Sequence, residues 1–384
     1  MRFRYEVIVR PNADDLAVVA RDWPKLQTSC PTAEAIYQSK AWFEHLHSAT
    51  DSEIMLVQVF DEDDRLVGHV PVRIVESHLS FWITSIHQLR CRYRCARILG
   101  SQPNLPDDPD CHMDVVREIL KAAPACDCVV SKTVKVNSAY HRALEMQGHL
   151  LSECLIYYPN GERAHPFVEL PEDFGAYLRK FSSKTRNTLR RKLKKITARF
   201  GKAATLERFT SEASAGRFVR LAAQVSATSW QHRELGPRIV DDDTHRRDFA
   251  DLARRGLLRS YVLFYGGEPC AFVVGYQHEG VFHYADVAYD GNLVAYSPGT
   301  MLVYLLIEDL ISHDRPRTLD FGIGDAAYKK FWGTSTIDVV SVWVFRKTPS
   351  NAFIVGTHRL FRSVVRRAKR LFRARYEGTR ARNA

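Results

Sequence analysis

The chain has 384 residues, of which 45% are hydrophobic and 26% charged, and its formal net charge is +11. This length suits two domains of roughly 100 to 200 residues, and the composition excludes global disorder. No run of about 18 apolar residues occurs, which excludes a membrane-spanning helix. Residues 1–10 lack the apolar core of a secretory leader, so we expect a cytoplasmic protein, peripheral at the inner membrane at most.

The first lobe is expected at residues 1–165 and opens with a short strand. Two apolar alternations, at 54–60 and 66–74, flank an acidic turn of the hairpin type. Beyond this hairpin the pattern indicates a loop at 102–109, a helix at 111–122, a buried strand at 128–132 and a helix at 140–147.

The second lobe is expected at residues 166–350. An early proline and acidic residues at 171–173 suit a helix start, and the pattern continues as one helix toward Phe200. Three strands joined by tight turns then predict an antiparallel meander, at 258–265, 270–277 and 281–289. A helix at 301–313 and strands at 317–321 and 339–345 complete an α/β lobe with a mixed, largely antiparallel sheet flanked by helices.

Two segments near the end of this lobe carry a specific pattern: YSPGTML at 296–302 and LDFGIGDAAYKKFW at 319–332. Together with the basic segment SSKTRNTLRRKL at 182–193, they resemble the CelD-like acetyltransferase family of the GNAT superfamily, the branch associated with cellulose and exopolysaccharide synthesis. That family is similar to the FemAB-type ligases, which pair two GNAT-like lobes and use aminoacyl-tRNA. The resemblance implies two GNAT-like lobes and transfer of an acyl group, expected to be acetyl, from acyl-CoA to an amine or hydroxyl of a sugar or envelope precursor.

The expected cofactor contacts lie where the helix at 301–313 begins. Ordinary GNAT enzymes carry a Q/R-x-x-G-x-G/A loop there, whose amides hold the pyrophosphate of CoA, whereas this chain has YSPGT at 296–300. A helix N-terminus containing Gly299 still presents N–H groups and the positive end of a dipole to phosphate. We therefore expect Ser297, Gly299 and Thr300 to bind the cofactor, although Pro298 supplies no donor.

Four candidate side chains follow the last glycine-rich turn at helical spacing: Asp325, Tyr328, Lys329 and Trp332. Tyr328 suits protonation of the leaving thiolate, and Lys329 suits binding of phosphate or acceptor. Asp325 either orients Lys329 or caps the helix, and Trp332 is a candidate substrate contact. The competing interpretation is a capping aspartate, a surface ion pair and core aromatics.

Strand 281–289 and its neighbour supply further candidates. Alternation places His283 and Tyr289 on one face of the strand and Tyr284 and Asp286 on the other. Asp286 is a candidate catalytic base beside the acceptor, and His283 is either a substrate contact or a structural histidine.

Asp320 and Trp230 each allow two interpretations. Asp320 closes a buried strand just before a glycine-rich turn, where a carboxylate either takes part in catalysis or caps local amides. Trp230 either stacks on a ring of the substrate or packs in the core.

Eight Lys and Arg residues lie between Lys180 and Lys195, and no acid occurs between Phe174 and Leu206. The run forms either a solvated helix face or a surface for an anionic partner, such as CoA phosphates, an acidic precursor, lipid phosphate or tRNA. Arg186 and Arg190, one helical turn apart, are the residues that we expect to contact the cofactor. Nucleic acid is expected as a partner only in a FemAB-like alternative that uses tRNA.

The last segment, residues 351–384, is expected to be a basic tail that forms an amphipathic helix from Thr357 onward. Residues 358–384 hold ten Lys or Arg residues and one acid, Glu377, and their apolar residues recur at helical spacing. Such a helix suits an anionic membrane surface or a polysaccharide synthase, or it packs on a lobe. The tail is also consistent with a second interpretation, in which the chain is a degenerate, non-catalytic GNAT scaffold of a synthase complex.

The eight cysteines do not indicate a metal site. Their C-x3-C and C-x-C spacings match no well-attested structural zinc pattern. Scattered reduced thiols are therefore expected, with no metal.

Overall fold

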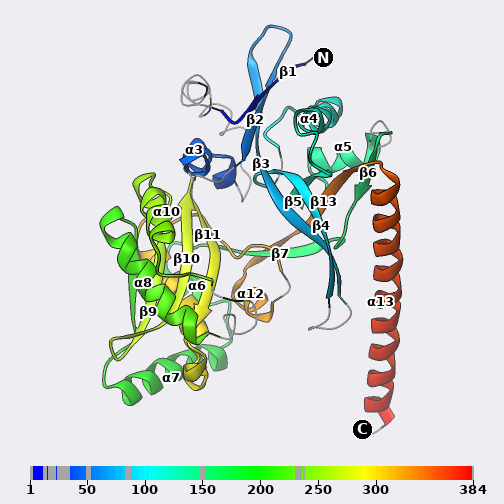
Figure 1. The fold of residues 1–384 in the computed structure, drawn as a ribbon. Helices are drawn as coiled ribbons and strands as arrows, with labels where there is room; N and C mark the ends of the chain where they lie inside the picture. The colour runs from blue at the N-terminus through cyan, green and yellow to red at the C-terminus, as the bar shows by residue number, and fades with distance from the viewer. Residues whose placement is uncertain are drawn as a thin grey trace. The chain divides into compact units, whose positions relative to one another are not determined.

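A computed structural model describes residues 3–11, 15, 23, 35–48, 53–82, 88–101, 103–147, 152–229, 236, 238–324 and 326–382. The chain divides into two compact units (Figure 1). Unit 1 comprises Met1–Ser29, Ser52–Glu162 and Val340–Ala384, and unit 2 comprises Cys30–Asp51 and Arg163–Val339. The break at residues 162 and 163 lies close to the predicted lobe boundary, whereas the C-terminal segment groups with unit 1.

Unit 1 is built on a mixed sheet in which β1, β2, β3 and β4 are antiparallel neighbours and β5 runs parallel to β4. A further strand, β6, pairs with the last residues of β13. The strands are β1 (Arg4–Val9), β2 (Ile54–Phe60), β3 (Leu66–Trp82), β4 (Gln88–Ile98), β5 (Cys128–Lys135), β6 (Cys154–Tyr157) and β13 (Ser335–Arg346). The hairpin of β2 and β3 is the predicted one, but β3 continues well beyond residue 74.

The helices of this unit whose bounds are described are α4 (Pro109–Ala122), α5 (Ala139–Gln147) and α13 (Pro349–Arg382). Helix α4 begins where the Asp108 carboxylate accepts hydrogen bonds from the amides of Asp110 and Cys111, with Pro109 in the first turn. Its apolar face packs on valines of β2 and β3 and forms the main core of the unit.

Unit 2 contains a six-stranded mixed sheet in the order β7-β12-β11-β10-β9-β8, and the first residues of β13 pair with β7. The pair β11 and β12 is parallel, and the other pairs are antiparallel. The strands are β7 (Arg163–Glu169), β8 (Thr205–Phe209), β9 (Ser260–Tyr265), β10 (Glu268–His278), β11 (Val281–Tyr289) and β12 (Thr318–Asp320). The predicted meander is thus present as β9, β10 and β11.

Helices cover both faces of this sheet because its strands carry apolar side chains on both sides. In β9, for example, Tyr261 and Leu263 belong to the core beneath α11, whereas Val262 belongs to the core beneath α8. The helical elements are η1 (Ala35–Gln38), α3 (Lys40–Ser48), α6 (Phe174–Leu178), α7 (Ser183–Phe200), α8 (Glu212–Thr228), α10 (Asp243–Arg254), η3 (Gly291–Tyr296), α11 (Pro298–Ser312) and α12 (Ala327–Trp332). The predicted α/β class with mixed sheets flanked by helices is confirmed.

The single helix predicted to run toward Phe200 is divided in two. Helix α6 ends at Leu178, and α7 starts after Ser182, whose hydroxyl accepts a hydrogen bond from the amide of Thr185 at 3.2 Å. The backbone of Ser182 is extended, so a new N-cap interrupts the helix although no proline or glycine is present at this point.

A β-bulge interrupts the pairing of β10 with β11. Gly275 lies opposite Tyr284 and Val274 lies opposite Asp286, which leaves Ala285 as the extra residue. The bulge shifts the alternation by one position, so Tyr284 lies on the α11 side together with Val287 and Tyr289. The predicted pairing of Tyr284 with Asp286 on one face is therefore wrong.

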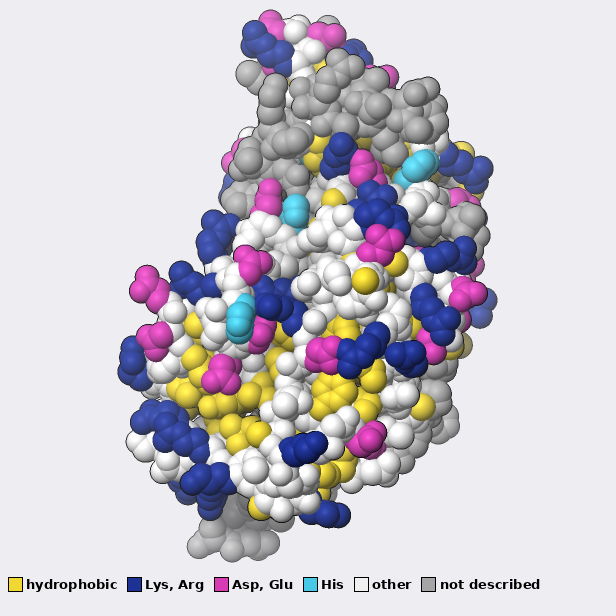
Figure 2. Space-filling model, turned by 90° about the vertical axis from the view of Figure 1, so that its left-hand side faces the viewer, with side chains coloured by type: hydrophobic (Ala, Val, Ile, Leu, Met, Phe, Trp, Pro, Cys, Tyr) yellow, Lys and Arg dark blue, Asp and Glu magenta, His cyan; other side chains and the backbone are white. Residues whose placement is uncertain are grey.

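Charge is unevenly distributed on the surface. Figure 2 shows one face on which basic and acidic side chains alternate in the upper part, while apolar side chains gather in the lower part. The net positive charge of the chain is therefore not distributed evenly over this face.

Gly275→Ala is expected to lower the free energy of unfolding by about 3 kcal/mol, because a new methyl group cannot fit beside the bulge. An ideal Cβ at Gly275 would lie 2.3 Å from the carbonyl oxygen of Arg259 and 2.3 Å from the ring of Phe282. Gly216→Ala is the control, since a Cβ there meets nothing within 4 Å and α8 should gain about 1 kcal/mol. Urea unfolding measures both variants, and equal stability would contradict the role given to Gly275.

Candidate functional site

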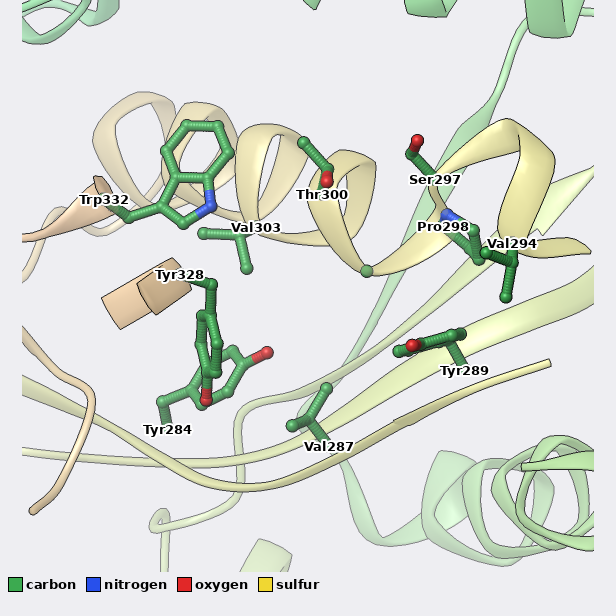
Figure 3. A pocket seen from close by; sticks show the side chains of 11 residues that line it. Tyr284, Val287, Tyr289, Val294, Ser297, Pro298, Thr300, Val303, Tyr328 and Trp332 are labelled. Carbon is green, nitrogen blue, oxygen red and sulfur yellow. The ribbon is translucent and has the colours of Figure 1, made fainter. Parts of the chain in front are cut away.

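A cavity of about 460 Å³ lies in unit 2 between β11 and the first turn of α11, with α12 at one end (Figure 3). Its walls are mostly apolar, and its polar groups are hydroxyls, an indole and backbone atoms. The lining residues are Tyr284, Val287, Tyr289, Val294, Ser297, Pro298, Gly299, Thr300, Val303, Tyr328 and Trp332.

The cavity opens where two parallel strands part. Strand β12 pairs with β11 only as far as the pair His283 and Asp320, and it ends there. The bulge at Ala285 follows immediately on β11, and the residues beyond it lie alongside α11 instead of a neighbouring parallel strand. Strand ends of this kind are common ligand sites in α/β sheets.

The N-terminus of α11 forms one wall of the cavity and contains three predicted cofactor contacts: Ser297, Gly299 and Thr300. Ser297 has φ +55° and ψ +51°, a left-handed conformation that is uncommon for a residue with a side chain. A Cβ at Gly299 would lie 3.3 Å from the ring of Tyr289, so glycine permits the close packing of helix and strand. The structure thus brings all three predicted residues to one place.

Two lysines of α7 reach this N-terminus. Lys192 Nζ donates a hydrogen bond to Ser297 Oγ at 2.9 Å. Lys195 Nζ lies 3.4 Å from the carbonyl oxygen of Ala295 and 5.0 Å from the centre of the Tyr296 ring. Neither lysine forms an ion pair with a described residue, and burial lowers the pKa of Lys192. Their positive charge therefore remains available to an anion at the start of α11.

The two arginines predicted for this role lie elsewhere on α7. Arg186 donates from Nη1 to the carbonyl oxygen of Phe181 at 2.6 Å and from Nη2 to the Ser183 hydroxyl at 3.1 Å. Arg190 does not line the cavity. It lies near Tyr304 of α11, where burial raises the pKa of the tyrosine and the positive charge of Arg190 partly offsets that effect. Arg186 thus stabilises the junction between α6 and α7.

Two tyrosines face each other at the other end of the cavity. The rings of Tyr284 on β11 and Tyr328 on α12 have centroids 6.4 Å apart, and Figure 3 shows the Tyr284 hydroxyl directed toward the space beneath Val303. Neither hydroxyl has a hydrogen-bond partner among the described residues. Burial raises the pKa of both tyrosines, so both hydroxyls are protonated at neutral pH and available as donors.

The other two described candidates on α12 differ in position, since Trp332 lines the cavity and Lys329 does not. Trp332 is buried and packs edge-on against Phe181, and its carbonyl oxygen accepts hydrogen bonds from Lys180 Nζ and Tyr177 Oη. Lys329 Nζ donates to the carbonyl oxygens of Gly322 at 3.2 Å and Ile323 at 2.9 Å. Lys329 therefore holds the glycine-rich turn, and burial lowers its pKa.

Asp320 lies in a buried cluster with two histidines. His165 of β7 bonds one carboxylate oxygen, and His283 Nδ1 lies 3.6 Å from the other. The amide of Gly322 also donates to Asp320 at 2.7 Å. Burial alone would raise the pKa of Asp320, but the hydrogen bonds from His165 and His283 outweigh it and hold that pKa well below its usual range.

The carboxylate of Asp286 forms an ion pair with an arginine. Arg238 donates to its two carboxylate oxygens at 3.0 and 2.7 Å, and the amide of Val287 donates to one of them at 2.8 Å. Neither Asp286, Asp320 nor His283 lines the cavity. His283 lies on the other face of β11, with its ring centroid 5.9 Å from that of Tyr37.

Two predicted site residues, Asp325 and Trp230, lie outside the described residues. Within the described ranges, no group of three or more His, Cys, Asp or Glu residues could hold a metal ion. The seven described cysteines are free thiols.

Sequence reasoning missed Tyr284, Val287, Lys192, Lys195 and His165. The basic run did contain both lysines, but only the fold shows which positions of α7 face the start of α11. The sequence did not reveal that Tyr284 and Val287 lie on the same face of β11, because the bulge at Ala285 changes the alternation of side chains without any distinctive residue in the sequence. His165 gives no local signal, because its partner Asp320 is far away in the chain.

Comparison with known proteins agrees with this geometry. Residues 183–330 match the family model described as an acetyltransferase (GNAT) domain, so the chain contains a GNAT domain. A crystal structure of FemX is similar at 11% identity and a TM-score of 0.59, covering 92% of this chain and 100% of FemX. A tandem GNAT protein from the clavulanic acid biosynthesis pathway is similar at 9% identity and a TM-score of 0.51, covering 91% and 99%. No curated protein matches the chain.

Asp320→Asn is expected to lower the free energy of unfolding by about 3–5 kcal/mol at pH 7, because two buried histidines lose their charged partner. The depressed pKa of Asp320 means that its contribution is complete above the unfolded value of about 3.9 and is lost as the pH falls through the folded value. The difference between wild type and variant, measured by urea unfolding from pH 7 to 3, should therefore shrink below about pH 4. Asp338→Asn, at an exposed position of β13, is the control. A constant difference over this range would contradict the assignment.

Proposed function

We propose that this protein transfers an acyl group, acetyl in the first instance, from acyl-CoA to an amine or hydroxyl of a sugar or cell-envelope precursor. One observation carries the proposal: the cavity extends from the N-terminus of α11 at one end to two tyrosine hydroxyls at the other, and these hydroxyls have no hydrogen-bond partner among the described residues. A CoA thioester requires both features, since it has phosphates at one end of its arm and a polar reacting carbonyl at the other.

The residues at the start of α11 suit the phosphates of CoA. Gly299 places a backbone N–H group at the positive end of the helix dipole, whereas the N–H of Thr300 donates to the Ser297 carbonyl oxygen at 3.1 Å. Thr300 therefore contributes its hydroxyl to this wall of the cavity. Pro298 removes one donor, and the charges of Lys192 and Lys195 offset that loss. This explains how a chain without the usual pyrophosphate loop can hold the same group.

The middle of the cavity suits the arm and the acyl group. Val287 and Val303 face each other across it, from β11 and α11. Apolar walls favour a short alkyl chain and exclude water, which strengthens hydrogen bonds to the reacting carbonyl.

In the reaction, the nitrogen or oxygen of the acceptor attacks the thioester carbon and forms the new bond. Negative charge develops on the carbonyl oxygen, which a tyrosine hydroxyl can stabilise by hydrogen bonding. The carbon–sulfur bond then breaks, and the thiolate takes a proton from Tyr328 or Tyr284. The described lining residues include no carboxylate or imidazole, so the proton lost by the acceptor passes to water, and water returns a proton to the tyrosinate.

The proposed class of acceptor is argued from the similarity of this chain to other proteins. The pattern at 319–332 resembles the CelD-like branch, and the fold is similar to that of FemX. A FemAB-like ligase with aminoacyl-tRNA as the donor is the second candidate. The observation that favours it is the pair Lys192 and Lys195 of α7, which form no ion pair with a described residue.

Replacement of both lysines by Lys192→Gln and Lys195→Gln is expected to raise the Kd for acetyl-CoA by about tenfold or more, because charge-assisted contacts to phosphate are lost. Isothermal titration with acetyl-CoA, longer acyl-CoAs and charged tRNA measures this. Arg191→Gln and Lys194→Gln together form the matched control, since both side chains are exposed on the same helix. Binding of charged tRNA without binding of any acyl-CoA would replace the first donor with the second, and binding of neither would overturn the proposal.

Tyr328→Phe is expected to lower kcat by about 10²-fold while leaving the Kd for acetyl-CoA nearly unchanged, because the hydroxyl acts on the departing thiolate. Thiol release with hydroxylamine as a small acceptor provides the assay. Tyr304→Phe removes a hydroxyl from α11 outside the cavity and is the control. If both variants behave alike, Tyr328 is not the acid, and the same assay on Tyr284→Phe then tests the other hydroxyl.

A further inference from the structure

A small pocket in unit 1 lies between helix α13 and the turn that follows β6. Tyr157 and Tyr158 line it from the end of β6, and Arg359, Arg362 and Arg366 line it from α13. Its volume of about 230 Å³ is below the roughly 300 to 1,000 Å³ of pockets for drug-sized ligands. The pocket therefore suits a small ligand, or one charged group of a larger ligand.

The three arginines converge on this pocket. Their spacing of three and four residues places them on one side of α13. The position of Arg359 is fixed, since Nη2 donates to the carbonyl oxygen of Ile156 at 3.0 Å and the guanidinium lies 5.3 Å from the centre of the Tyr157 ring. Burial raises the pKa of Tyr157, and the positive charges of all three arginines partly offset that effect. All three guanidiniums are therefore close to one tyrosine side chain.

The wall behind the arginines is formed before any ligand binds. The Tyr157 hydroxyl forms a hydrogen bond with Nδ1 of His358, and His358 Nε2 lies 3.1 Å from the carbonyl oxygen of Ser80 on β3. Tyr157 and His358 are both buried. These contacts join α13 to β6 and β3, so the pocket lies on rigid elements, as a binding site of defined geometry requires.

No acidic side chain among the described residues balances the three charges. The sequence has no Asp or Glu between Asp338 and Glu377, and none of the three arginines forms an ion pair with a described residue. Glu162 follows the turn directly, but it is exposed and also forms no ion pair with a described residue. Three neighbouring guanidiniums repel one another, and a bound anion would relieve that repulsion.

We propose that this pocket binds the phosphate group of an organic phosphate. A phosphate monoester has a charge of about −1.5 to −2 at pH 7 and three strong acceptor oxygens, so it can accept hydrogen bonds from all three guanidiniums. A carboxylate has a single charge and would leave most of the positive charge unbalanced. The matched GNAT domain, residues 183–330, lies in unit 2, so the pocket gives unit 1 a ligand of its own. The inference does not depend on the acyl-transfer reaction.

Isothermal titration of the full chain with glycerol 3-phosphate tests the proposal. Arg366→Gln is expected to raise the Kd about tenfold, because charge-assisted hydrogen bonds to phosphate are lost. Arg367→Gln is the matched control and should leave the Kd unchanged, since Arg367 is exposed on the same helix and does not line the pocket. Replacement of Arg359, Arg362 and Arg366 together by Gln should raise the Kd by roughly 100-fold or more, and replacement by Lys should have a smaller effect.

Two further comparisons show where the phosphate binds and what supplies it. The pair Lys192→Gln and Lys195→Gln should leave this Kd unchanged, because both lysines belong to unit 2. Flotation with phosphatidylcholine vesicles that contain phosphatidic acid tests a lipid headgroup as the source. Binding of these vesicles that the triple glutamine variant loses identifies a lipid, and binding of glycerol 3-phosphate alone identifies a soluble ester.

Either source supports the proposal, and three results would overturn it. The first is that the wild type binds neither probe. The second is that the triple glutamine variant, shown to be folded by circular dichroism, binds the probes as tightly as the wild type. The third is that the binding of glycerol 3-phosphate is lost in the Lys192 and Lys195 variant and retained in the arginine variant, because the phosphate would then bind in unit 2.

Discussion

The separation of β11 from β12 is the constraint on which the site depends. Two parallel strands that stayed paired to their ends would leave no space between the sheet and α11. Strand β12 stops at Asp320, and the bulged residue Ala285 lies two positions beyond His283, the last residue of β11 that pairs with β12. The bulge also rotates Val287 and Tyr289 to the side of Tyr284, so a single extra residue both opens the cavity and supplies its floor. The buried cluster of Asp320, His165 and His283 then fixes the point at which the strands part.

Helix α11 must be held still if its first turn is to bind a ligand, and both of its ends are anchored. Arg259 is buried and donates from Nη2 to the carbonyl oxygen of His313 at 2.7 Å and from Nη1 to that of Asp314 at 2.9 Å, which satisfies the C-terminal end of the helix. At the other end, Lys192 holds Ser297 in a strained backbone conformation. The proposed phosphate site therefore lies on a rigid element, as binding sites of defined geometry require.

The sequence predicted the elements whose pattern is local. The meander has clear turn signals, the helix that starts at Pro298 has a proline in its first turn, and the pattern of residues 111–122 indicated α4. The pattern at 319–332 indicated the GNAT superfamily, whose domain model matches residues 183–330. The predictions that were wrong concern features without a distinctive local sequence. The bulge at Ala285 contains no glycine that would indicate it. The break between α6 and α7 is at Ser182, and serine also occurs inside helices. Arg186 and Arg190 were chosen from a basic run in which only three-dimensional packing distinguishes Lys192 and Lys195. The sequence did not indicate that Asp286 forms an ion pair, because its partner Arg238 lies in a different segment.

The most direct test of the account is a crystal structure of the chain with a non-hydrolysable acetyl-CoA analogue. The account predicts the pyrophosphate against the amide of Gly299 and the hydroxyl of Thr300 with Lys192 nearby, the arm between Val287 and Val303, and the carbonyl oxygen within hydrogen-bonding distance of Tyr328 or Tyr284. An analogue bound elsewhere on unit 2, or one whose carbonyl points away from both tyrosines, would contradict it.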